Sequence, residues 1–247
     1  MSTTTTSAYI VGNALLTFPK GFSKQSQDDV MNLIIFSELV ANKQYDKLAQ
    51  LSKWYGSFLA TLEQIGWVND SSITFIYTFT LTSNNNIDFN SSPTISDSRF
   101  NPIPIGQFTL VDNLVIATLQ ISLSGPEVSS VKDVIQALQS GNDVQAKLFN
   151  GQATDRGSGQ QANFGIRSCQ MGDGNPTCLL NAFDLTFSKS TSSSGVLFQG
   201  LSQSDTGSGG YVNMRLNADI YNTICDTVLQ KLGGSRAGGL VQEITLW

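Results

Sequence analysis

The sequence predicts an α+β protein, layered α/β/α, in which two helical hairpins pack around a largely antiparallel sheet. Apolar residues recur at spacings of three and four across residues 45–65, the period of one buried helical face. From residue 163 on, short alternating segments are separated by glycine-rich turns, which is typical of an antiparallel strand meander. A sheet with two apolar faces needs cover on both sides, and two helical hairpins provide it.

The N-terminal segment leads into the first helix. Residues 1–7 are expected to be a flexible tip, and residues 8–18 a short strand or an extended entry segment. Ser26 and Asp29 form a capping-box pattern, which predicts a helix from there to about Asn42.

A second helix follows almost at once. Residues 42–44 are so short a link that the helix at 45–65 is expected to return antiparallel to the first. Gly66 suits the end of that helix, where a residue with positive φ is favoured. Alternation over residues 72–83 then predicts a strand with one apolar face.

The pattern in the middle of the chain predicts the second helical hairpin. Residues 84–106, rich in Asn, Ser and Pro, are expected to be a long loop. Residues 108–123 are expected to be helical in their first half, although alternation in their second half also fits a strand. Residues 127–140 form the other arm, with Pro126 in its first turn.

The C-terminal part is expected to be a meander closed by a helix, within a single domain covering residues 1–247. The expected strands are residues 164–171, 178–188, 196–202 and 211–220, and the helix is residues 220–232.

Composition excludes several classes of function. The chain has 14 basic and 19 acidic residues, a net charge of −5, and its basic residues are scattered, so nucleic acid is not an expected partner. It has no histidine, which removes the histidine-dependent nucleophilic triads and the commonest zinc ligand. We therefore predict a protein that is not an enzyme, with no catalytic residues, no metal site and no cofactor. The glycine-rich residues 157–159 and 207–210 lack a phosphate-binding context and are expected to be turns.

Three cysteines are the candidate reactive residues. Cys169 and Cys178 lie at equal distances from the turn at residues 172–175, so they are expected to face each other across a hairpin. They form either a cross-strand disulfide or a pair of free thiols. Cys225, on the last predicted helix, is either a buried structural thiol or an acylated or reactive one.

Aromatic residues concentrate around the second helix. Trp54, Tyr55, Phe58 and Trp67 are spaced as a buried helical face would be, which favours core packing. The other interpretation is an interfacial membrane contact by Trp54, Tyr55 and Trp67, because Trp and Tyr are enriched at that boundary.

No secretory signal or membrane-spanning segment is recognisable. The N-terminus lacks a basic region, and the longest apolar run, residues 108–123, is shorter than the roughly 20 residues that a span needs. We expect cytoplasmic synthesis without a signal peptide, with release by a leaderless route or lysis.

Two resemblances add to these inferences. Residues 41–46, 53–55 and 62–68 resemble bacterial proteins related to the Erwinia virulence factor Evf. This resemblance implies an α/β protein associated with host colonisation. The cysteine-linked fatty acid of that group is not carried over, because its cysteine is matched by none of Cys169, Cys178 and Cys225.

The order of elements is also similar to that of the Cyt-type cytolytic δ-endotoxins. Residues 124–126, before the helix at 127–140, and the late strand meander lie where that architecture places them. The resemblance implies helices that separate from the sheet and strands that enter a bilayer.

These observations lead to three hypotheses of function. The leading one is a non-enzymatic, membrane- or lipid-directed toxin or virulence-type protein, pore-forming and able to form a homo-oligomer. The alternative is a soluble binding or self-assembling structural protein with a neutral surface rich in Ser, Thr and Asn. The third, and weakest, is an enzyme that uses a carboxylate or Cys225.

Overall fold

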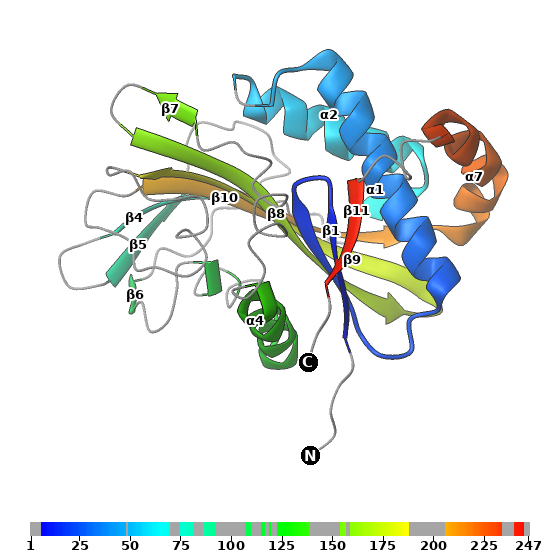
Figure 1. Cartoon of the computed structure of the whole chain (residues 1–247), viewed down its shortest axis with the longest axis horizontal. Coiled ribbons are helices and arrows are strands. Elements are labelled where there is room, and N and C mark those ends of the chain that lie inside the picture. The colour runs from blue at the N-terminus through cyan, green and yellow to red at the C-terminus, as the bar shows by residue number, and fades with distance from the viewer. Residues whose placement is uncertain are drawn as a thin grey trace.

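A computed structural model of the chain shows an eleven-stranded sheet with helices on both faces (Figure 1). It describes residues 6–47, 49–69, 75–81, 86–91, 107–109, 115–116, 119, 123–138, 154–156, 159–187, 206–233 and 240–244. The strand order is β11-β1-β2-β8-β9-β10-β4-β5-β6, with β3 on β10 and β7 on β8. Among the described strands β2 and β8 pair in parallel and the other pairs are antiparallel. The predicted α+β class is confirmed.

The bounds of the elements are as follows. The strands are β1 Ser7–Val11, β2 Ala14–Phe18, β3 Trp67–Asn69, β4 Phe75–Leu81, β5 Asn86–Ser91, β6 Gln107–Thr109, β7 Thr154–Arg156, β8 Gly159–Gly172, β9 Asn175–Phe187, β10 Thr206–Leu216 and β11 Val241–Ile244. The helices are α1 Lys24–Gln44, α2 Leu51–Gln64, α4 Gly125–Leu138 and α7 Ala218–Leu232.

The segment expected to be a single strand or an entry segment is a hairpin. β1 and β2 pair through a two-residue turn at Gly12 and Asn13, and Gly12 takes a φ of 60°. Turns of this kind need positive φ, which glycine adopts without steric cost. Thr6 is buried and Ser7 begins β1, so the predicted flexible tip does not extend to these two residues; residues 1–5 lie outside the described part.

The first helical hairpin is confirmed, with corrected ends. α1 begins at Lys24 because the hydroxyl of Ser23 accepts from the backbone N–H of Ser26 at 3.0 Å. Ser26 therefore does not cap the helix, and the expected capping box with Asp29 is wrong. Ser23 and Ser26 both fit a cap by residue type, and only the backbone geometry distinguishes them.

The second helix of this hairpin starts later than predicted, at Leu51. Before it, the backbone N–H of Ala49 donates to the carboxylate of Asp46, and the backbone N–H of Gln50 donates to the carbonyl of Asp46. Its predicted buried face is correct, since Trp54, Phe58 and Leu62 are almost fully buried. Gly66 follows the helix at a φ of 101°, as expected.

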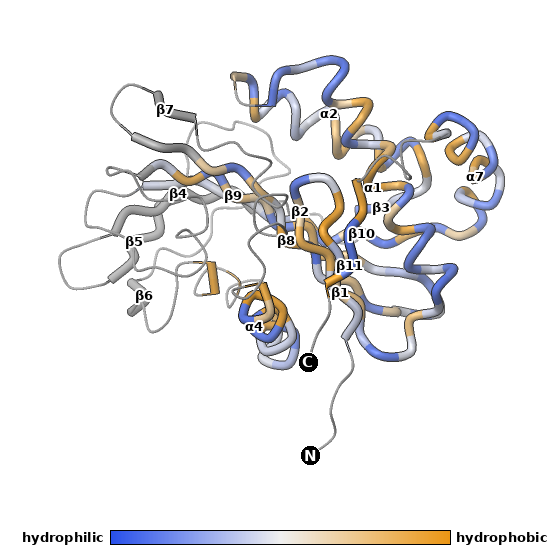
Figure 2. Tube along the Cα trace, viewed as in Figure 1, coloured by the Kyte–Doolittle hydropathy of each residue, from blue (hydrophilic) through white to orange (hydrophobic). Residues whose placement is uncertain are grey.

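Strands alternate between two apolar clusters, one on each face of the sheet. In β1, Ala8 and Ile10 belong to the cluster under α4, whereas Tyr9 and Val11 belong to the cluster under α1, α2 and α7. Successive side chains of a strand point to opposite faces, so both faces are apolar and both are covered. Figure 2 shows hydrophobic segments turned towards the sheet and hydrophilic segments on the outer sides of α2 and α7.

The second hairpin region differs in detail from the prediction. The expected loop at residues 84–106 contains β5, which pairs with β4. The expected helix at residues 108–123 begins as strand β6, and residues 115, 116 and 119 are helical. α4 then starts after Ser124, whose backbone N–H donates to Glu127 at 2.8 Å.

The meander follows the prediction at its centre and departs from it at its ends; the expected turn at residues 207–210 is wrong, because these residues lie within β10 and pair with β4 and β9. β8 and β9 form the expected hairpin around Asp173 and Gly174, both with positive φ. β10 ends at Leu216 instead of residue 220, because the side chain of Asn217 accepts from two backbone N–H groups and caps α7. The expected strand at residues 196–202 lies outside the described residues.

Candidate functional site

A buried ion pair joins the first helix to the middle of the sheet. Nη2 of Arg167, on β8, donates to Oε1 of Glu38, on α1, at 2.6 Å, and both side chains are at least nine-tenths buried. The guanidinium carbon of Arg167 also lies 5.0 Å from the ring centre of Phe58 on α2. Nη1 of Arg167 is buried without a hydrogen-bond partner. One strand residue thus contacts both helices of the hairpin.

The β1–β2 turn lies directly against this pair. A Cβ at Gly12 would overlap Oε2 of Glu38, so the carboxylate occupies the space that any other residue would need. The backbone N–H of Gly12 donates to the carbonyl of Leu240 at 2.9 Å. The glycine is therefore required here both for its φ and for the close approach of a charged side chain.

Asn13 connects this turn to its surroundings. Its Nδ2 donates to the carbonyl of Asn163 at 3.1 Å, and its backbone carbonyl accepts from Gly165 at 3.1 Å. Its Oδ1 accepts from Nζ of Lys47 at 2.7 Å. The oxygen and the NH₂ group of the Asn13 side chain are therefore both hydrogen-bonded. These bonds join the β1–β2 turn to β8 and to the α1–α2 linker.

A cavity of about 630 Å³ opens next to this cluster. It is lined by the last turns of α1, the linker to α2, the β1–β2 turn, Trp54 and Leu240. Nζ of Lys47 lies 4.0 Å from the ring centre of Trp54, and the indole N–H donates to Oδ1 of Asn42 at 2.6 Å. The volume is in the range of small-molecule sites, which are typically about 300–1,000 Å³.

Burial shifts the ionisation of two groups in this region. It lowers the pKa of Lys47 to about 8, with Glu38 opposing and Arg167 reinforcing that shift. It raises the pKa of Tyr55 to about 12, with the positive charge of Arg167 opposing and the negative charge of Glu38 reinforcing that change. Perturbed groups beside a cavity are candidates for a functional site.

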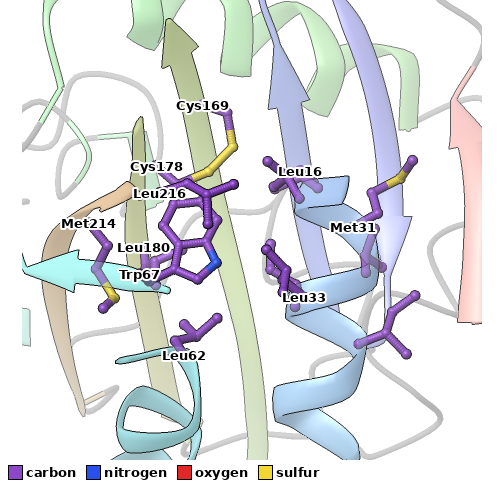
Figure 3. Packing of buried hydrophobic residues seen from close by; sticks show 14 of the residues in the cluster. Leu16, Met31, Leu33, Leu62, Trp67, Cys169, Cys178, Leu180, Met214 and Leu216 are labelled. Atoms are coloured by element: carbon purple, nitrogen blue, oxygen red, sulfur yellow. A yellow bond between two sulfur atoms is a disulfide. The ribbon is translucent and has the colours of Figure 1, made fainter. Parts of the chain in front are cut away.

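The structure places the two predicted hairpin cysteines in the core. Cys169 and Cys178 are directly opposite in the β8–β9 register, with Cα atoms 4.2 Å apart and a disulfide between them. They are almost fully buried in the cluster under α1, α2 and α7. In Figure 3 the indole of Trp67 lies below this disulfide, beside Leu180 and Leu216.

Cys225 is a free, partly buried thiol on α7 that packs against the same cluster. Its Sγ makes long contacts of 3.7 Å to the carbonyl of Asn222 and 3.9 Å to Oδ1 of Asp226. It is not brought together with the other two cysteines. Its acylation or reactivity stays a prediction.

The predicted membrane-contact residues Trp54, Tyr55 and Trp67 do not form an exposed surface patch in this conformation. Trp54 is 1 % exposed and stacks on Phe58, and Trp67 is 2 % exposed. Tyr55 is partly buried against them. Trp54 and Phe58 lie four residues apart on one face of α2, which turns both towards the sheet, and Trp67 is the buried first residue of β3. A membrane contact by Trp54, Tyr55 and Trp67 therefore requires the helices to separate from the sheet.

Two further observations concern metal ligands and membrane-spanning helices. Within the described residues, no group of three or more acidic, Cys or His side chains is placed to hold a metal ion. None of the helices in the described ranges is long and apolar enough to cross a membrane.

The polar cluster of Glu38, Arg167, Asn13 and Lys47 was not among the predicted site residues. One local signal exists for Glu38, because it lies four residues after the buried Ile34 and so falls on the apolar face of α1. Arg167 likewise lies within a predicted strand, two residues before Cys169 on the same face. The signal that identifies such sites is a charged residue at a position that the helix or strand period assigns to the buried face.

Comparisons with known proteins give only a weak likeness. No protein-family model matches this chain, and no curated protein matches it by sequence. A solved δ-endotoxin is similar with a TM-score of 0.41 and 9% identity, over 85% of this chain and 86% of that one. The solved Evf virulence factor is similar with a TM-score of 0.40 and 9% identity, over 90% and 83% of the two chains. The two resemblances are confirmed as weak structural likenesses, and they carry no conclusion about activity.

Proposed function

We propose that the protein is a non-enzymatic, membrane- or lipid-directed toxin or virulence-type protein, in which the β8–β9 region meets lipid after α4 moves away. The observation that carries the proposal is the apolar surface that this strand pair turns towards α4. One face is apolar and carries Ala162, Phe164, Ile166, Phe183 and Leu185. The other face is mixed: it carries Asn163, Arg167 and Asp184, with Asn163 and Asp184 directly opposite each other, together with Cys169, Cys178 and Leu180.

The lengths of these strands support the same proposal. β8 has 14 residues, β9 has 13 and β10 has 11. A tilted strand needs about 9–11 residues to cross the hydrocarbon core of a bilayer. Three neighbouring antiparallel strands are therefore long enough to do so.

α4 is the main part of the layer that keeps the apolar face from water, and Val115, Ile116, Leu119 and Leu123 belong to the same cluster. The buried side of α4 consists of Val128, Val131, Val134, Ile135 and Leu138, and these belong to the same cluster as the apolar residues of β8 and β9. Figure 1 shows α4 on the opposite side of the sheet from α1, α2 and α7. Lipid could replace this amphipathic cover, because hydrocarbon is as apolar as the side chains it would displace.

A membrane role also implies self-association. Inside a bilayer every backbone N–H and C=O group must be paired, so a strand edge exposed to lipid is not stable. Copies of this chain would have to pair their sheet edges. The partners implied are thus a lipid membrane and a homo-oligomer of the protein.

Vesicle experiments test this function directly. The protein is mixed with dye-loaded vesicles of zwitterionic and of anionic phospholipid, before and after limited proteolysis, and both dye release and co-sedimentation are measured. Hydrogen exchange on the vesicle-bound protein should show loss of protection in α4 and retained protection in β8 and β9. Absence of both release and binding with every lipid overturns the membrane function, whereas release with α4 still protected overturns this route to it.

A second candidate, a soluble binding or self-assembling protein, is favoured by the cavity of about 630 Å³ beside Lys47. Light scattering after size exclusion and a carbohydrate array separate it from the first. A large assembly formed without lipid, or a specific glycan signal, would favour this candidate.

A further inference from the structure

Lys47 lies at the cavity between the first helical hairpin and the β1–β2 turn, and no carboxylate in the described part of the chain pairs with it. Its Nζ donates to the neutral amide oxygen of Asn13 and lies over the indole of Trp54. No other acceptor for its hydrogens is found among the described residues. By contrast, the exposed Lys24 pairs with Asp28 at 3.5 Å. The amine of Lys47 is thus fixed in position at a cavity wall.

Burial outweighs the charges around Lys47 and disfavours its protonated form. Glu38 is the negative charge that acts on this amine, and its carboxylate is already bound by Arg167. Burial, with the positive charge of Arg167, lowers the pKa of Lys47 to about 8, and Glu38 opposes this change. The other ionisable groups that line the cavity or act on the amine are Glu38, Lys43, Tyr45, Asp46 and Arg167.

Two amide groups at the same cavity offer donors. Oδ1 of Asn42 accepts from the indole of Trp54, and Oε1 of Gln44 accepts from the hydroxyl of Ser57 at 3.1 Å. Both side chains line the cavity, and their NH₂ groups donate to no acceptor in the described part of the chain. An amide whose oxygen is occupied recognises ligands through its N–H groups, that is, ligands with an acceptor such as a carbonyl oxygen.

We propose that Lys47 is a covalent capture site for a small aldehyde, with Asn42 and Gln44 as donors to the aldehyde oxygen. This site is independent of the proposed action on membranes. It rests on the juxtaposition of a fixed amine, two amide donors and a cavity of small-molecule size.

The step is a reversible condensation. The lone pair of the neutral amine forms a bond to the carbonyl carbon, the π electrons move to the oxygen, and a proton passes from nitrogen to that oxygen. Loss of the hydroxyl group with a second proton as water leaves an imine between Nζ and the former aldehyde carbon. The reaction needs no oxidant or reductant. A partly buried amine with a lowered pKa is the usual activated form of lysine in such chemistry.

Reductive trapping on the intact protein tests the proposal. The full chain is incubated at neutral pH with propanal and cyanoborohydride, and the alkylation rate of each lysine is followed by peptide mass mapping. We expect Lys47 to react at least about tenfold faster than the exposed Lys43 and Lys53, because an exposed lysine is almost fully protonated there. Its rate should level off above about pH 8.

Two results overturn the proposal. A rate for Lys47 no greater than that of Lys43 or Lys53 removes the capture site, and this comparison uses the unmodified protein, so no variant has to fold. Gln44→Met, at an exposed position, removes one donor pair while keeping the side-chain length. We expect it to slow capture several-fold, and an unchanged rate overturns the role of Gln44 in aldehyde recognition.

Discussion

Arg167 on β8 binds Glu38 on α1 across 129 positions of the sequence, with 2.6 Å between Nη2 and Oε1. The pair is buried where the first helical hairpin meets the sheet. The attraction between two buried charges little more than offsets the free energy of removing both from water, whereas one buried charge without a partner strongly destabilises the fold. The pair therefore specifies how the hairpin is placed on the sheet more than it adds to stability.

Breaking this pair from one side should be strongly destabilising. We expect Arg167→Met to lower the free energy of unfolding by about 3–5 kcal/mol, because it leaves the carboxylate of Glu38 buried and unpaired. The double variant Glu38→Leu with Arg167→Met should recover much of that loss. Urea denaturation of the single and double variants gives the coupling energy.

The exposed pair of Lys24 and Asp28 provides the control, since the side chain of Lys24 is 65% exposed. Lys24→Met should change stability by less than about 1 kcal/mol. Additive losses in the double variant at Glu38 and Arg167 would show that these two residues are not coupled.

Gly12 should tolerate substitution much less than another glycine with a positive φ. Gly12→Ala combines a left-handed backbone with overlap of the new Cβ and Glu38, whereas Gly21 has a φ of 96° and open space around it. We expect Gly21→Ala to cost about 1 kcal/mol from backbone strain, and Gly12→Ala about 1–3 kcal/mol more. Equal thermal midpoints for the two variants would contradict the close approach of Glu38 to the turn.

Some of this structure follows from local sequence pattern. The buried face of α2 follows from helical periodicity, which places Trp54, Phe58 and Leu62 on one side. The opposition of Cys169 and Cys178 follows from symmetry about a two-residue turn. In both cases the information lies within about 20 residues of the chain.

Other parts depend on contacts that no local pattern contains. The choice of Arg167 as the partner of Glu38 is set by the parallel pairing of β2 with β8, a contact between distant segments. Lys47 enters the site only because the second helix starts at Leu51, which leaves a linker long enough to reach Asn13. The sequence pattern misplaces the ends of the helices by a few residues, because Ser and Asn suit several positions in a turn.

The disulfide between Cys169 and Cys178 should form in air-oxidised protein and stabilise it. Because Cys169 and Cys178 are buried, alkylation is done on the urea-unfolded chain; without reduction it should modify one of the three cysteines, Cys225, and after reduction all three. Because the bond closes a loop of about ten residues, its reduction should lower the free energy of unfolding by about 2–3 kcal/mol. Cys225→Ser is the control and should respond to reductant as the parent does. Three reactive thiols before reduction would argue for free thiols.

Lys47 should make the stability of the protein rise with pH in the mildly alkaline range. In the unfolded chain a lysine has a pKa of about 10.4, whereas burial lowers that of Lys47 to about 8 in the fold. Between these values the unfolded chain binds more protons, so the free energy of unfolding increases with pH. Below about pH 8 the cost of the buried charge is fully present.

Lys47→Met should remove this rise, since it has no group to titrate there. The free energy of unfolding is measured in urea from about pH 7 to about pH 9.5, with Lys43→Met, an exposed neighbour, as the matched control. The pH range of the measurement stops at about 9.5 because the ionisation of Tyr55 lowers the free energy of unfolding at higher pH. The pKa of Tyr55 is raised to about 12, so stability is lost as the pH rises above about 10 towards that value. Parallel curves for the parent and Lys47→Met would mean that the amine of Lys47 is as solvated in the fold as in the unfolded chain.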